Sequence, residues 1–177
     1  MNETERGSLF ERPMPAGYRD ELRALMAIDA PKRPASLESI FLFQLGPLRL
    51  ALPTRVASAV SPVLHVARIP HRSGTVLLGL VAFRGEILPC FSLAQLLDVA
   101  QSETGSARML ILEEAPGRLW AAPIDAVVGI RTIPEQLSEE QGPLPAHWLR
   151  GSFNYQSRSF YILDHITLFR QITLATA

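Results

Sequence analysis

Gly79-Leu80-Val81-Ala82-Phe83-Arg84-Gly85 is the stretch that decides the fold. Its apolar residues are typical of a buried β-strand, and its two glycines permit a close backbone approach or a positive φ angle. Arg84 is the exception in this apolar run. It either presents a directional donor to a partner or forms an internal salt bridge, for which Glu86 is a candidate. On these residues alone, the internal salt bridge is the favoured interpretation.

Short strands continue on both sides of this stretch. Apolar residues 40–45 and 48–52 are separated by the turn residues Gly46-Pro47, and a second hairpin of this kind spans residues 109–122. This texture of short strands and Gly- or Pro-marked turns predicts a mostly β domain of paired small barrels rather than an α/β sheet.

Two short helices are expected to follow strands. Ser92 and Gln95 have capping-box spacing before Leu96-Leu97. Asp164 can likewise cap a helix over residues 166–170.

The two hairpins are related by a weak repeat. Leu50-Ala51-Leu52-Pro53 is echoed by Trp120-Ala121-Ala122-Pro123, and Cys90-Phe91-Ser92 by Ile162-Leu163-Asp164. A period of about 70 residues is too long for a solenoid and indicates two similar β subdomains that form one unit. We expect these at roughly 36–105 and 106–173 within a domain spanning 36–173; chance similarity between β-rich segments is the alternative.

Composition restricts the classes of function. The chain has 177 residues, of which 47% are hydrophobic, and its 17 acidic and 17 basic residues balance. Neutrality argues against a general attraction to nucleic acid or to an anionic membrane. No apolar run approaches the roughly 20 residues that span a bilayer, so direct membrane insertion is not expected. A single cysteine, Cys90, and a polar, acidic N-terminus favour a cytoplasmic setting.

Residues 1–35 are expected to form an extension of the domain. Within it, residues 16–28 predict a short amphipathic helix, because Tyr18, Leu22, Leu25 and Met26 fall on one stripe. Residues 29–34 carry two prolines and indicate a linker.

The sequence contains no pattern typical of an enzyme or of a metal or cofactor site. It has no phosphate-binding loop, dinucleotide fingerprint or nucleophile elbow. Its four histidines are scattered, without metal-ligand spacing. Cys90 lies in an apolar run and is expected to be a buried, inert thiol. Glu113 and Glu114 lie beside a turn and are expected to be solvated, while Trp120 and Trp148 are expected in the core or at the interface between the subdomains.

Residues 78–93 resemble the signature of the CheW family, roughly G-v-x-N-l-R-G-x-x-x-P-v-x-D-L. The positions that match are Gly79, Arg84, Gly85, Pro89 and Leu93. Three flanking segments, 43–53, 124–127 and 161–164, also resemble the family, so the likeness runs from about Ser39 to Ile172.

The resemblance implies two interlocked, five-stranded, SH3-like β-barrel subdomains with short helices. It also implies an adaptor without enzymatic activity that bridges the cytoplasmic tip of a methyl-accepting chemoreceptor to the regulatory domain of a CheA-type histidine kinase, within receptor arrays at the membrane. The residues that it implies at the receptor-binding groove are Val56, Gly79, Arg84, Gly85 and Val127.

Several residues depart from the family pattern or resemble one particular type of adaptor within the family. Ala82 replaces an asparagine, Ser92 an aspartate and Ala59 a glutamate of the family pattern, which puts contact with a standard chemotaxis receptor in doubt. Residues 9–19 and 68–74 are similar to the second CheW-type (WspD-like) adaptor of Wsp-type surface-sensing pathways. The alternative function is a small β-barrel module that binds nucleic acid or another protein; the neutral charge and few aromatic residues argue against nucleic acid.

Overall fold

The computed structural model describes residues 37–72, 74–100, 105, 107–134 and 142–176. The expected helix at residues 16–28 lies outside these residues. The described elements are β1 (Leu37–Leu45), β2 (Leu48–Pro53), β3 (Ala57–Pro62), β4 (Leu77–Phe83), β5 (Glu86–Phe91), α2 (Leu93–Leu96), β6 (Arg108–Ala115), β7 (Arg118–Ile124), β8 (Ala126–Pro134), the 3-10 helix η1 (Ala146–Trp148), β9 (Leu149–Tyr155), β10 (Arg158–Leu163) and α3 (His165–Thr176).

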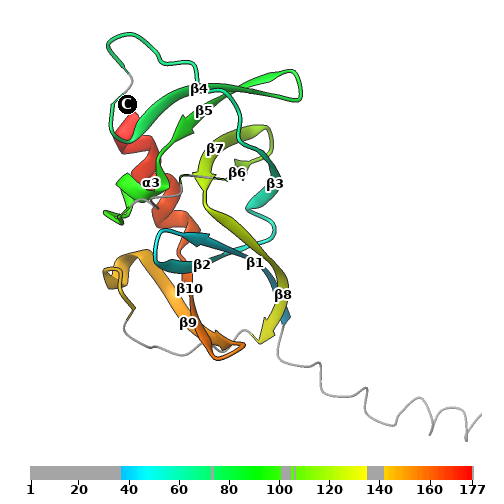
Figure 1. The fold of residues 1–177 in the computed structure, drawn as a ribbon. Coiled ribbons are helices and arrows are strands. Elements are labelled where there is room, and N and C mark those ends of the chain that lie inside the picture. The colour runs from blue at the N-terminus through cyan, green and yellow to red at the C-terminus, as the bar shows by residue number, and fades with distance from the viewer. Residues whose placement is uncertain (1–36, 73, 101–104, 106, 135–141, 177) are drawn as a thin grey trace, which may run out of the picture. The chain divides into compact units, whose positions relative to one another are not determined.

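The described strands form two five-stranded sheets, which confirms the mostly β class (Figure 1). Sheet A has the order β8-β1-β2-β10-β9, and sheet B has the order β3-β6-β7-β5-β4. In each sheet one inner pair is parallel, β2 with β10 and β5 with β7, whereas the other pairs are antiparallel. The hairpins expected around Gly46-Pro47 and within residues 109–122 are β1–β2 and β6–β7.

The two sheets have the same topology because the chain repeats itself. Strands β1 to β5 followed by α2 correspond in order to β6 to β10 followed by α3. Replacing each strand by its counterpart converts the order of sheet A into that of sheet B.

Each half of the repeat contributes strands to both sheets. Sheet A takes β1 and β2 from the first half and β8 to β10 from the second, so sheet B is built from one continuous stretch, β3 to β7. The expected subdomains 36–105 and 106–173 therefore do not coincide with the two sheets, because each contributes strands to both. Sequence similarity marks the repeat, whereas strand exchange between the halves sets the sheet membership.

A large hydrophobic core is shared by the two sheets. Alternate residues of a strand point to opposite faces, so Phe41 and Phe43 of β1 enter this central core while Ile40 and Leu42 enter a smaller core of sheet A. In the same way, residues of β6 divide between the central core and a third core on sheet B. Burial on both faces explains why these strands have continuous rather than alternating apolar sequences.

Contacts between the edge strands link the ends of each sheet. In sheet B, the chain that leaves β3 pairs with β4, because the backbone amides of Ala67 and Leu80 each donate to the carbonyl of the other at 2.8 Å. In sheet A, Arg131 of β8 donates to the hydroxyl of Tyr155 of β9 at 2.6 Å and lies over its ring.

The helices α2 and α3, which follow β5 and β10, begin as expected. The Ser92 hydroxyl accepts a hydrogen bond from the backbone N–H of Gln95 at the start of α2. The Asp164 carboxylate accepts from the backbone N–H groups of Ile166 and Thr167 at the start of α3. Helix α3 extends beyond the expected end at residue 170, because it continues to contribute side chains such as Ile172 to the central core. No helix among the described residues is long and apolar enough to cross a bilayer.

The chain passes between the sheets at two crossover points. Residues 54–56, here called the first crossover, lead from β2 into β3. Asp125 leads back from β7 into β8: its backbone N–H donates to the Gln44 carbonyl, and its carboxylate accepts from the Gly46 N–H at 2.6 Å. The two crossovers therefore hold each sheet to the other through backbone hydrogen bonds as well as through the shared core.

Candidate protein-docking site

Arg84 and Gly85 form the two-residue turn between β4 and β5. Phe83 and Glu86 are paired across the hairpin, and the φ angles of the two turn residues are 50° and 87°. Positive φ at both positions is typical of a type I′ turn, which matches the twist of the flanking strands. The second position suits glycine, whereas the first places an arginine in a conformation that non-glycine residues rarely adopt.

The Arg84 side chain is exposed and points over a neighbouring ring. Its guanidinium carbon lies 5.0 Å from the centre of the Phe83 ring. Neither Arg84 nor Glu86 takes part in an ion pair with the described residues, so the alternative of an internal Arg84–Glu86 salt bridge is wrong. The guanidinium therefore keeps its donors available at the tip of a rigid hairpin.

Gly79 has a structural reason to be glycine. Its φ angle is 149°, and a Cβ atom there would lie 2.2 Å from the carbonyl oxygen of Ala67. The close backbone approach expected at this residue is therefore present, and it belongs to the bridge between Ala67 and Leu80. Gly79 and Arg84 are five residues apart along an extended strand, about 17 Å, so Gly79 does not lie beside the guanidinium.

Val56 is buried at the end of the first crossover. Its side chain is 3% exposed and belongs to the central core. Its backbone is fixed as well, because its N–H donates to the Pro53 carbonyl and its carbonyl accepts from the Glu113 N–H. A buried side chain of this kind can support a docking surface but offers little contact area of its own.

Val127 belongs to an exposed apolar strip on β8, the edge strand of sheet A. Val127, Val128 and Ile130 are 41%, 42% and 58% exposed. Sequence reasoning found Val127 and missed the other two, although three apolar residues in four positions are a detectable signal. Edge strands present free backbone groups and side chains to partners, so this strip is a candidate contact surface. It lies on a different sheet from the Arg84 turn.

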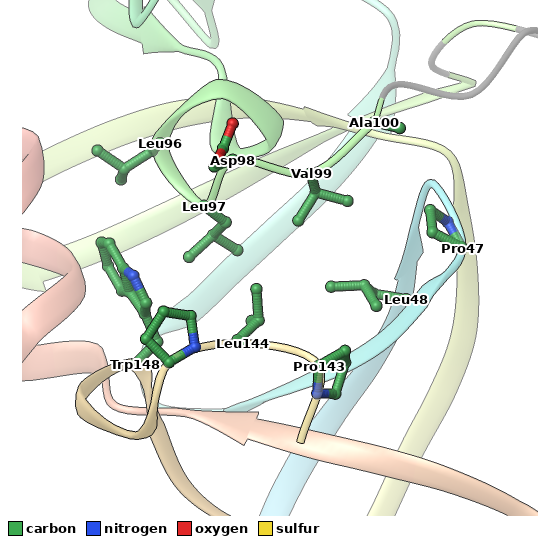
Figure 2. A pocket seen from close by; sticks show the side chains of 11 residues that line it. Pro47, Leu48, Leu96, Leu97, Asp98, Val99, Ala100, Pro143, Leu144 and Trp148 are labelled. Carbon is green, nitrogen blue, oxygen red and sulfur yellow. The ribbon is translucent and has the colours of Figure 1, made fainter. Parts of the chain in front are cut away.

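Two of the open pockets formed by the described residues have room for a small ligand, and neither has the features of an active site. The first, of about 410 Å³, is lined by apolar residues such as Leu48, Leu97, Leu144 and Trp148, with Asp98 as its one charged residue (Figure 2). The remaining lining residues are Pro47, Leu96, Val99, Ala100, Pro143 and Pro145.

The second pocket, of about 520 Å³, lies between the beginnings of β5 and β7 and includes Glu86, Ile87 and Trp120. At its edge the Trp120 indole N–H donates to Glu114, which also pairs with Arg118. These contacts engage the Glu114 carboxylate in structure, whereas the Glu86 carboxylate is exposed and stands without an ion-pair partner among the described residues.

The other side chains considered for chemistry or ligand binding lie in surroundings typical of structural residues. Cys90 is fully buried, and burial raises the pKa of its thiol to about 11, as expected for an inert thiol. The described residues contain no group of three or more His, Cys, Asp or Glu side chains placed to hold a metal ion. Trp120 and Trp148 are each 7% exposed in the central core, which confirms their expected place.

Comparison with known proteins agrees with this architecture. A family model described as the CheW-like domain matches residues 39–173. The protein FrzA of Myxococcus xanthus is 28% identical over 108 residues, which cover 61% of this chain and 66% of FrzA, slightly less than two thirds of its length. The scaffolding protein TtCheW from Thermoanaerobacter tengcongensis has a similar fold, with a TM-score of 0.62 and 19% identity over 73% of this chain and 90% of TtCheW. The chain therefore belongs to the CheW-like domain family.

Proposed function

We propose that the chain is an adaptor without enzymatic activity that couples a methyl-accepting chemoreceptor to a CheA-type histidine kinase. The observation that carries the proposal is the CheW-like domain over residues 39–173, folded as two strand-exchanged sheets. Such a protein works on the cytoplasmic face of receptor arrays and acts through its surfaces. The two sheets, whose edges are linked by backbone or side-chain contacts, would each behave as a small barrel with its own exposed ends.

The receptor tip would contact the Arg84 turn and the apolar strip of β8. An exposed guanidinium supplies a directional hydrogen bond or ion pair, and an apolar strip supplies the buried contact area on which affinity depends. Val127 belongs to this contact surface, whereas Val56, Gly79 and Gly85 support it: the first through the central core, the others through the backbone geometry of β4 and its turn.

The pathway would be one of the Wsp type, in which this chain is the second, WspD-like adaptor. The support is the sequence at residues 9–19 and 68–74, together with Ala82 and Ala59, which depart from the pattern of standard chemotaxis adaptors. Both alanines lie in the described domain, on β4 and β3. A changed contact residue near a docking surface alters the choice of partner without changing the fold.

The test measures binding to a receptor-tip fragment. Arg84→Ala should weaken binding by about tenfold, as expected for loss of a charged hydrogen bond at an interface, while the thermal midpoint stays nearly unchanged. Gln156→Ala is the matched control, because Gln156 occupies the corresponding position of the β9–β10 turn, with a φ angle of 49°. A variant that loses stability and keeps its affinity would show that Arg84 is structural.

Coupling itself needs a second partner in the same assay. The full chain should bring the receptor fragment and the kinase regulatory domain into one complex in a pull-down, whereas either partner alone should not capture the other. Repeating the assay without residues 1–35 separates the contribution of the extension from that of the domain. Binding of neither partner by the folded protein would contradict the proposal.

A further inference from the structure

A charged cluster surrounds His165 where four segments distant in sequence meet. Glu38 of β1 accepts hydrogen bonds from Arg55 of the first crossover at 2.8 Å and from Arg150 of β9 at 2.6 Å. Arg55 also lies 3.5 Å from Nε2 of His165, the first residue of α3. The Glu38 side chain is 15% exposed, whereas those of Arg55 and Arg150 are 60% and 31% exposed, so water reaches these ion pairs from the arginine side.

The surroundings of the His165 ring disfavour its protonated form. A protonated imidazole has two N–H donors and needs an acceptor for each. Nε2 faces the Arg55 guanidinium, which donates and cannot accept, and Nδ1 is buried with no hydrogen-bond partner among the described residues. The neutral ring with its proton on Nδ1 can instead accept a hydrogen bond from Arg55 through Nε2, so the conflict at Nε2 disappears and only the Nδ1–H stays without a partner among the described residues.

The charges that act on His165 already balance without it. Arg55 and Arg150 are opposed by Glu38 and Asp164. Both oxygens of Glu38 are bound to arginines, and Asp164 is engaged by the N-terminal turn of α3. A proton on His165 would add a positive charge beside Arg55, while both neighbouring carboxylates are already hydrogen-bonded to other groups.

We propose that the His165–Arg55 contact is a pH-sensitive latch on the first crossover, closed while His165 is neutral and released when His165 is protonated. Release frees Arg55 from the helix and leaves the crossover held by Glu38 and by the backbone bonds of Thr54 and Val56. Because Arg55 is followed by the buried Val56, the latch affects the first crossover, where the chain passes from one sheet to the other. This inference does not depend on the proposed function.

The direction of the pH dependence follows from the same surroundings. Burial first, and then the charge of Arg55, lower the pKa of His165 below its usual value. The closed form therefore takes up the proton less readily than the open form, in which Arg55 no longer faces the ring, and the reference for both is the ordinary histidine pKa of about 6.5. The closed form dominates above that pH and loses its advantage as the pH falls below it.

The test is amide hydrogen exchange of the full chain at pH 7.5 and pH 5.5, read at the amides of Thr54 and Val56 and corrected for intrinsic exchange rates. Protection at these two amides should fall by about three- to tenfold at the lower pH. Amides within β6, such as that of Leu110, serve as an internal reference and should change less.

Two variants make the test decisive. His165→Gln cannot titrate and should remove the pH dependence, and Arg55→Gln should lower protection at both pH values and remove the dependence as well. His65→Gln is the matched control, since His65 is exposed, and it should behave as the wild type. Equal protection at both pH values in the wild type, or an unchanged pH dependence in His165→Gln, would overturn the proposal.

Discussion

At residue 79 the backbone of β4 touches the chain that follows β3, and only a residue without a Cβ atom fits. Gly79→Ala would place that atom 2.2 Å from the Ala67 oxygen and keep a φ angle of 149° that side chains rarely adopt. We expect a loss of about 2–4 kcal/mol in the free energy of unfolding, because a backbone atom cannot move aside cheaply. Chemical denaturation measures it.

Gly74→Ala is the control for this substitution. No atom lies within 4 Å of a Cβ placed on Gly74, so its stability should change by less than about 0.5 kcal/mol. Comparable losses in the two variants would mean that the close approach at Ala67 is not what requires glycine.

Prediction of single residues from the sequence succeeded where the surroundings of a residue restrict which residue types can occupy the position. Glycine at position 79 predicted a close approach, and the apolar run around Cys90 predicted burial. It failed for the Arg84–Glu86 ion pair, since the choice between a bonded and a free guanidinium depends on turn geometry that composition does not encode. It also could not show that Val56 is buried while Val127 is exposed, because both are valines in β-rich surroundings.

Among the elements, the stability of α3 depends on Asp164, the residue that caps its N-terminus. Asp164→Ala removes the acceptor for the N–H groups of Ile166 and Thr167 and should cost about 1 kcal/mol at pH 7. Burial alone would raise the pKa of Asp164, but hydrogen bonds from Thr167 and Ile166 hold it below its usual value.

A carboxylate whose pKa is lowered by folding stabilises the protein above its unfolded pKa, about 3.9 for aspartate. The difference between wild type and Asp164→Ala should therefore shrink as the pH falls below about 4, through the folded pKa of Asp164. Thermal unfolding at a series of pH values tests this. A difference that stays constant down to pH 2 would show that the charge of Asp164 does not contribute.

The caps of both helices were predictable because capping is local: Ser92 and Asp164 act on residues two or three positions away. The end of α3 was not, because it is set by tertiary contacts of Ile172 with the central core rather than by a stop signal at residue 170. Of the exposed strip of β8 only Val127 was predicted, for a related reason: the apolar residues of the strip are visible in the sequence, but their exposure is not. Whether a strand lies at a sheet edge is decided by its neighbours in space, not by its own residues.

For the whole molecule, the exchange of strands between halves has no local signal at all. The repeat was visible as Leu50-Ala51-Leu52-Pro53 and its counterpart at residues 120–123. The same repeat would also be expected if each half formed a sheet of its own. What decides the matter is that β1 and β6 are apolar on both faces. Each needs a core on either side, and exchange supplies a shared core between the sheets.

Strand exchange leads to a prediction about fragments. Residues 36–105 lack β8 and β10, which pair with β1 and β2, and residues 106–177 lack β3 and β5, which pair with β6 and β7. Since hairpins without neighbours are marginally stable at best, each half alone should show no cooperative thermal transition by circular dichroism. Mixed in equal amounts, the halves should form a one-to-one complex that unfolds cooperatively.

The shared core supplies the control for this reconstitution. Phe43 of β1 is fully buried in the core to which both halves contribute. A first half carrying Phe43→Asp would bury an unpaired charge there and should fail to associate. A cooperative transition in either half alone would contradict the exchange, because it would mean that one half holds a complete sheet without the strands of the other.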